Sequence, residues 1–175
     1  PKTAFDPEMG AYGRWFPDGV TNTCYNCLDR HVAAGRGDQA AIIHDSPITG
    51  TKRTLSYSEM LADVEAFAGA LSDRGVTRGD RVVIYMPMVP EALVAMLACA
   101  RLGAVHSVVF GGFAASELAS RIEDCQAKLV VSASCGIEPG RIVAYKPLLD
   151  AAIEQSSYKP EAAIILQRNE HRCDM

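Results

Sequence analysis

The hydrophobic pattern of the chain alternates between short apolar runs and stretches with helical spacing. From residue 81 onward, four apolar runs predict strands and the three stretches between them predict helices. An earlier helix begins behind a capping box at Ser56 and Glu59 and ends at Gly75. The expected elements from residue 40 onward are strands at 40–44 and 53–57, that helix, a strand at 81–85, a helix from Pro90 to near Gly103, a strand at 104–110, a helix at 115–125, a strand at 128–132, a helix at 146–155 and a strand at 162–166.

This alternation predicts an α/β fold, with a parallel sheet, helices on both faces and right-handed crossovers. In such sheets ligands lie outside the carboxyl ends of the strands. Two loops therefore qualify as a site: residues 111–114, which follow the strand ending at Phe110, and residues 133–141, which follow the strand at 128–132. If those two strands are neighbours, the two loops share one rim of the sheet.

The first 21 residues form a separate region in this prediction. They carry Pro7, Pro17 and three glycines, which is typical of an irregular arm. The apolar pair Trp15-Phe16 is expected to dock that arm on the body. Asn22 is expected to cap a short helix where the body begins. We therefore divide the chain into residues 1–21 and residues 22–175.

Composition narrows the class of protein and its compartment. A hydrophobic content of 49% and a charged content of 22% are those of a globular protein. A net charge of −4 without a Lys/Arg cluster argues against a nucleic-acid partner, and no apolar run reaches the roughly 18 residues of a membrane span. The six scattered cysteines fit reduced thiols, and no secretory signal is visible. The expected compartment is the cytoplasm, or the mitochondrial matrix if a targeting segment has been removed.

Two groups in the candidate loops can be interpreted in two ways. Gly111-Gly112 either makes room for a ligand or turns the chain, and glycine turns at such junctions are the more common case. The chain has neither G-x-G-x-x-G nor a P-loop motif, so it shows no triphosphate cradle. Arg141 either holds a phosphate or stacks on a base, since its guanidinium is planar, forked and always charged, or it pairs with Glu138 at the surface.

A complete catalytic constellation is missing from the pattern. The four histidines show no mutual spacing that builds a site, and His106 is expected to be a core residue because it lies inside an apolar strand. Cys24 and Cys27 have the spacing of half a zinc site, but no second pair follows them. We therefore assign no catalytic residue and no metal ligand within residues 1–175.

Four longer runs identify a family: WFPDGVTNTCYNCLDRHV, LSYSEMLADVEAFAGAL, GVTRGDRVVIYMPMVPEALVAMLACARLGAVHSVVFGGF and RIEDCQAKLVVS. In these runs the chain, from about Trp15 to its end, resembles the amino-terminal part of the acetyl- and propionyl-CoA synthetases. These are AMP-forming enzymes of the adenylate-forming superfamily. The strings NCLDRH and HSVVFGGF are specific to this subfamily, and GIEPGRIVAYKPLLDAAI looks more like the propionyl branch.

The resemblance implies a two-step ligase, of which residues 22–175 would be an incomplete first subdomain of the AMP-binding domain. Propionate or acetate and ATP, with Mg²⁺, would give an acyl-adenylate and pyrophosphate, and CoA would then displace AMP. Phe110 and Val143 would flank the adenine of CoA and Arg141 would meet a phosphate. Acetyl-type members commonly carry a basic residue where Glu138 stands. The implied CoA-binding residues are Phe110, Gly111, Gly112, Glu138, Pro139, Gly140, Arg141 and Val143.

The family's ATP loop, its adenine motif, its ribose-binding Asp and its catalytic Lys are absent from these 175 residues. The resemblance implies that they would lie beyond Met175, so residues 1–175 alone are expected to be inactive. Two alternatives remain open. The chain could be a stand-alone, non-catalytic nucleotide-binding or interaction module of the same fold. It could also belong to an adenylating enzyme that hands its acyl group to a carrier protein.

Overall fold

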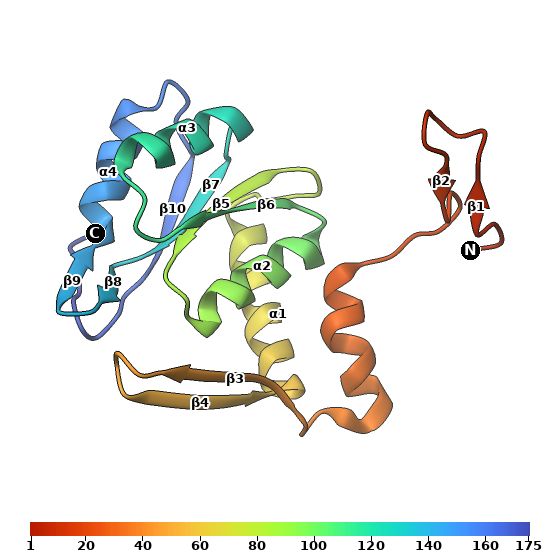
Figure 1. Ribbon diagram of the computed structural model, residues 1–175, viewed down its shortest axis with the longest axis horizontal. Helices are drawn as coiled ribbons and strands as arrows, with labels where there is room; N and C mark the ends of the chain where they lie inside the picture. The colour runs from red at the N-terminus through yellow and green to blue at the C-terminus, as the bar shows by residue number, and fades with distance from the viewer.

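A four-stranded parallel sheet forms the centre of the molecule (Figure 1). The computed structural model describes residues 1–175, and the sheet has the strand order β10-β7-β5-β6. All of its strand pairs are parallel, so the predicted α/β fold is confirmed. The strands are β5 (Arg81–Met86), β6 (Val105–Phe110), β7 (Leu129–Ala133) and β10 (Ala162–Leu166).

Helices cover both faces of this sheet. On one face α1 (Tyr57–Asp73) packs against α2 (Pro90–Leu102), and on the other α3 (Ala115–Cys125) packs against α4 (Tyr145–Gln155) (Figure 1). The chain runs from the central β5 to the edge strand β6 and then crosses back to β7. The connections after β5 and β7 therefore turn to opposite faces, which creates a switch point at their carboxyl ends. None of the helices is both long and apolar enough to cross a membrane.

The burial of each strand follows its position in the sheet. Every residue of β7 is buried, as are Val82 to Met86 of β5. The edge strand β6 has one free side, and its Val105, Val108 and Phe110 are exposed. His106 also lies on this edge and is exposed, although partial desolvation lowers its pKa. The expectation of a core histidine was wrong, because an apolar run does not reveal whether its strand is central or at an edge.

Local capping signals explain where α1 and α2 begin and end. The Ser56 hydroxyl accepts a hydrogen bond from the Glu59 amide at 3.2 Å, and the Glu59 carboxylate accepts one from the Ser56 amide at 2.7 Å. These bonds lower the pKa of Glu59. Gly75 and Gly103 follow the two helices in the left-handed conformation. The predicted capping box is thus confirmed, and α1 buries Met60, Val64, Ala68 and Leu71 at helical spacing.

A β-hairpin and two short helical turns precede α1. The two predicted strands are present: β3 (Ala40–Ser46) pairs antiparallel with β4 (Thr51–Ser56). The turns η1 (Tyr25–Asp29) and η2 (Val32–Arg36) have π-helical hydrogen bonding. The Asn22 side chain accepts from the Tyr25 amide at 3.1 Å and donates to carbonyl oxygens at the end of α2. Asn22 therefore caps this region and also attaches it to the body.

The first residues lie apart from the body (Figure 1). Two short strands, β1 (Phe5–Asp6) and β2 (Arg14–Trp15), form a small hairpin there. Trp15 packs on the Phe5 ring with centroids 4.8 Å apart, and it remains 69% exposed. The expectation that Trp15-Phe16 docks the arm on the body was wrong, because the aromatic contacts of Trp15 stay within residues 1–21.

We predict that Ser56→Ala lowers the free energy of unfolding by about 1 kcal/mol, because α1 loses its amino-terminal cap. Urea denaturation of residues 1–175 measures the change. Ser72→Ala is the matched control, since Ser72 is exposed within α1 and its side chain makes no hydrogen bond. A Ser56→Ala effect no larger than the control effect would contradict the prediction.

Candidate functional site

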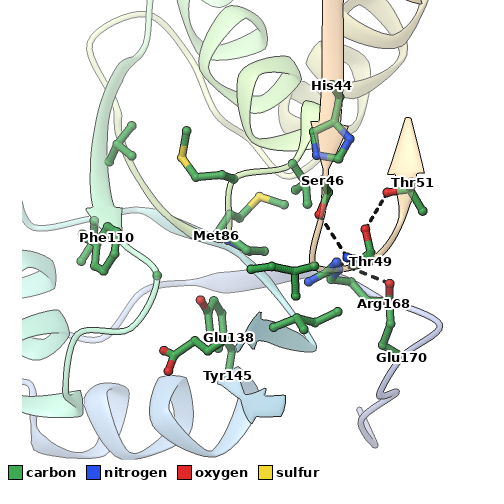
Figure 2. Close-up of a pocket in the computed structure, with 18 residues that line it drawn as sticks. His44, Ser46, Thr49, Thr51, Met86, Phe110, Glu138, Tyr145, Arg168 and Glu170 are labelled. Atoms are coloured by element: carbon green, nitrogen blue, oxygen red, sulfur yellow. Dashed lines mark hydrogen bonds and ion pairs between the residues drawn. The ribbon is translucent and has the colours of Figure 1, made fainter. Parts of the chain in front are cut away.

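The two candidate loops meet at the carboxyl ends of the strands, although their parent strands are not neighbours. β5 lies between β6 and β7, so adjacency of the two parent strands does not explain the shared rim. A Cβ atom on Gly112 would nevertheless lie 3.8 Å from a carboxylate oxygen of Glu138. The residues after β7 bridge the distance as a hairpin, which brings Glu138 beside the end of β6 (Figure 2).

This hairpin replaces the loop expected at residues 133–141. It consists of β8 (Cys135–Glu138) and β9 (Arg141–Ala144), joined by the turn Pro139-Gly140. Gly140 has φ of +79°, a conformation that favours glycine. Arg141 and Glu138 face each other across the turn, with Arg141 Nη2 2.6 Å and Nε 2.7 Å from Glu138 Oε2. The ion pair considered from the sequence is therefore present, while 70% of the Arg141 side chain stays exposed.

The Tyr145 side chain packs against both segments, the end of β6 and the β8–β9 hairpin. A Cβ atom on Gly111 would lie 2.5 Å from the Tyr145 hydroxyl and 2.7 Å from the carbonyl oxygen of Met86. A Cβ atom on Gly136 would lie 2.6 Å from two carbons of the Tyr145 ring. Both glycines are thus required for close packing inside the protein. Gly112 has φ of +146°, so its role in the turn also needs no ligand.

Tyr145 is itself fixed by a second tyrosine. Its ring stacks on Tyr85 with centroids 4.9 Å apart, and the Tyr85 hydroxyl donates to the carbonyl oxygen of Phe113 at 2.9 Å. Burial raises the pKa of Tyr145 to about 12, and the nearby Tyr85 and Glu138 act in the same direction. Tyr145 therefore keeps its proton at neutral pH and acts as a structural side chain at this site.

The two apolar residues of the predicted CoA site differ in exposure. Phe110 is 66% exposed at the end of β6 and meets Phe113 edge to face with centroids 5.8 Å apart. Val143 is half-buried on β9, opposite Gly136, and packs against the core. Phe110 therefore offers an aromatic surface to a ligand, and Val143 offers part of a wall.

A cavity of about 550 Å³ adjoins this rim (Figure 2). Its other walls come from the β3–β4 hairpin, the residues after β5 and the residues after β10. Of the eight predicted site residues, three line the cavity: Phe110, Gly111 and Glu138. The other five lie outside it, on the adjoining turns and on strand β9: Gly112, Pro139, Gly140, Arg141 and Val143. The structure thus brings the two loops together but divides the predicted set between a cavity and an outer surface.

Several polar residues of the cavity were not suggested by the sequence. His44 Nδ1 is buried without a hydrogen-bond partner. Arg168 donates to the carbonyl oxygen of Cys135 at 3.2 Å and lies 3.5 Å from Glu170. His44, Tyr145 and the pair Arg168 and Glu170 come from three distant parts of the chain and form no local motif. Only the folded arrangement brings them together.

The chemistry available at this rim is recognition of a ligand. An aromatic face, a guanidinium and small residues suit a nucleotide base and its phosphates. No group of three or more His, Cys, Asp or Glu side chains is arranged to hold a metal ion. Cys24 is buried, Cys27 is exposed, and all six cysteines are free. Activated nucleophiles and paired acid and base groups are not observed at the rim.

The fold is that of an α/β domain, and its candidate site lies outside the carboxyl ends of a parallel sheet. A family model described as AMP-binding enzyme matches residues 29–173. The chain therefore belongs to the AMP-binding enzyme family.

Named relatives agree with this assignment. The chain is 55% identical over 154 residues to "Acyl-CoA synthetase short-chain family member 3, mitochondrial" of Rattus norvegicus, covering 88% of this chain and 22% of the relative. The Homo sapiens protein of the same name is 54% identical over 155 residues, covering 89% and 23%. "Acetyl-coenzyme A synthetase" of Xanthobacter autotrophicus is 47% identical over 173 residues, covering 99% and 26%. The chain thus spans about a quarter of the length of these relatives.

We predict that Gly136→Ala destabilises the chain by about 1–3 kcal/mol, because the new methyl group overlaps the Tyr145 ring. Urea denaturation again provides the measurement. Gly69→Ala is the matched control: Gly69 lies in α1, and a Cβ atom added there would meet no atom within 4 Å, so this change should be neutral or stabilising. Equal effects of the two substitutions would show that Tyr145 does not fill the space beside Gly136.

Proposed function

We propose that the full-length protein is an AMP-forming short-chain acyl-CoA synthetase. It converts propionate or acetate, ATP and CoA into acyl-CoA, AMP and pyrophosphate. The family membership of the chain and the names of its relatives support this proposal. Residues 22–175 supply the first subdomain of its AMP-binding domain, and residues 1–21 form an amino-terminal arm.

The observation that carries the CoA site is the meeting of the two loops at the carboxyl ends of the strands. In this proposal the exposed Phe110 ring stacks on the adenine and Val143 forms the facing wall. Arg141 binds a phosphate from the turn of the β8–β9 hairpin. Gly111 and Gly112 have no side chains, so the nucleotide can lie close to the backbone at the end of β6. Pro139 and Gly140 form the turn between Glu138 and Arg141 and so present Arg141 to the ligand.

The bond-making steps belong to other parts of the protein. ATP and Mg²⁺ are bound mainly by residues outside 1–175, where Mg²⁺ neutralises phosphate charge. The present chain binds and orients the nucleotide part of CoA, so that the thiol of CoA reaches the acyl-adenylate. We propose small-molecule substrates as its partners, without nucleic acid or a membrane. We place the enzyme in the cytoplasm, or in the mitochondrial matrix if a targeting segment is removed.

We predict that the full-length protein releases pyrophosphate from ATP in the presence of propionate or acetate, and forms acyl-CoA when CoA is added. A coupled pyrophosphate assay and chromatography of the thioester measure the two steps. Residues 1–175 alone should form no acyl-adenylate, because they contribute no ATP-binding loop. If the full-length protein releases no pyrophosphate with propionate and none with acetate, the proposed activity is refuted.

We predict that Phe110→Ala in the full-length enzyme raises KM for CoA about tenfold and leaves KM for ATP unchanged, since stacking on a base contributes about 1–3 kcal/mol. Phe16→Ala is the matched control, because Phe16 is also exposed but lies in the arm. Initial rates at varied CoA and varied ATP give both constants. An unchanged KM for CoA in the Phe110→Ala enzyme would show that the adenine does not stack on Phe110.

A further inference from the structure

We propose that Glu138 limits the affinity of this enzyme for CoA by occupying Arg141. The inference rests on the proposed CoA site. It assigns Glu138 the role of a residue that weakens the binding of CoA. Glu138 is not a phosphate ligand in this assignment, because a carboxylate accepts hydrogen bonds and carries the same sign of charge as a phosphate. It acts on the ligand through the one guanidinium that faces it.

The contact geometry explains the competition. Arg141 Nε and Nη2 both lie within 2.7 Å of the same carboxylate oxygen, Glu138 Oε2. These two nitrogens form one edge of the guanidinium, and that edge is a forked donor that suits two oxygens of a phosphate. A phosphate that uses this edge must displace the carboxylate. A phosphate that uses the opposite edge approaches a cation whose charge is already balanced.

The surroundings offer no free cation to replace Arg141. Lys146, at the start of α4, lies 2.7 Å from a carboxylate oxygen of Asp150. Arg168 is paired with Glu170, and only 12% of its side chain is exposed. Each of the three cations around the rim thus has a carboxylate partner, and the net charge of the three pairs is zero. Removing the Glu138 charge changes this balance and frees the most exposed cation of the three.

The Glu138–Arg141 pair is not required for the shape of the hairpin. Exposed ion pairs contribute little to stability, and 39% of the Glu138 side chain and 70% of the Arg141 side chain are exposed. The backbone pairing of β8 with β9 and the positive φ of Gly140 determine the turn independently. A carboxylate that adds little to the fold, and opposes the charge of the proposed ligand, therefore needs a different explanation.

Release of the product provides that explanation. CoA and acyl-CoA carry the same nucleotide, so a contact with its phosphates stabilises substrate and product equally. Such uniform binding slows dissociation of acyl-CoA without accelerating the chemical step. By holding Arg141, Glu138 weakens the nucleotide contact for both molecules. The rim then positions CoA through Phe110 and retains the thioester product less tightly.

The test uses the full-length enzyme with Glu138→Gln, the double variant Glu138→Gln/Arg141→Gln, and Asp45→Asn as matched control. Asp45 also forms an exposed ion pair across a hairpin, 3.0 Å from Lys52. Initial rates give KM for CoA and for ATP, and inhibition by acyl-CoA gives the product inhibition constant. We expect Glu138→Gln to lower KM for CoA and this inhibition constant by about threefold to tenfold, with kcat not increased, because an exposed charge on the rim has been removed.

The double variant should lose this gain, with a KM for CoA at or above that of the wild type, because no guanidinium is left for the Glu138→Gln change to free. Asp45→Asn should change neither constant, and the gain in Glu138→Gln should shrink as NaCl is added. An unchanged KM for CoA in Glu138→Gln would overturn the inference, and so would a double variant that keeps the lowered KM for CoA. Absence of acyl-CoA synthesis by the wild type would instead refute the proposed function on which the inference rests.

Discussion

The stacked pair of Tyr85 and Tyr145 is the contact on which the rest of the rim depends. Tyr85 is buried in the central strand β5, and Tyr145 begins α4 at the end of the β8–β9 hairpin. The Tyr145 ring fills the space above Gly136, and its hydroxyl fills the space beside Gly111. The end of β6 and the hairpin after β7 are therefore positioned by the same side chain, although a strand separates β6 from β7. A larger residue at either glycine would push the two segments apart.

The strand order gives this contact its functional position. Since the connections after β5 and β7 leave toward opposite faces, the sheet has a natural crevice at their carboxyl ends. The hairpin after β7 lies at this crevice. It brings Glu138 and Arg141 to the edge of the sheet where β6 ends at Phe110. Phe110 and Arg141 are both strongly exposed beside a core that is tightly packed. A ligand can therefore meet an aromatic face and a charged group without rearrangement of the sheet.

Much of the fold could be predicted from the sequence because its signals are local. Apolar runs, the capping box at Ser56 and the glycines that end the helices each identify an element from a few adjacent residues. Strand order depends on contacts between distant segments, so the position of β6 at the edge, and with it the exposure of His106, could not be read from a single run. Trp15 was misplaced for a related reason: Phe5, ten residues earlier, was an equally good apolar partner.

The residues of the candidate site divide in the same way, into those with a local sequence signal and those that meet only in the fold. Gly111 and Arg141 could be proposed as site residues because they follow a strand and a turn, and Phe110 because the family resemblance implies it. His44 and Arg168 were not found, since they approach the cavity only after folding. Tyr145 shows the limit most clearly: it precedes a lysine at a helix start, and nothing nearby in the sequence indicates that two glycines are shaped around it. The glycine pair, which looked like space for a ligand, is first of all space for a protein side chain and a turn. Any recognition of a nucleotide here must therefore come from the groups that remain exposed, and among these the balance of charge between Glu138 and Arg141 decides how strongly a phosphate is held.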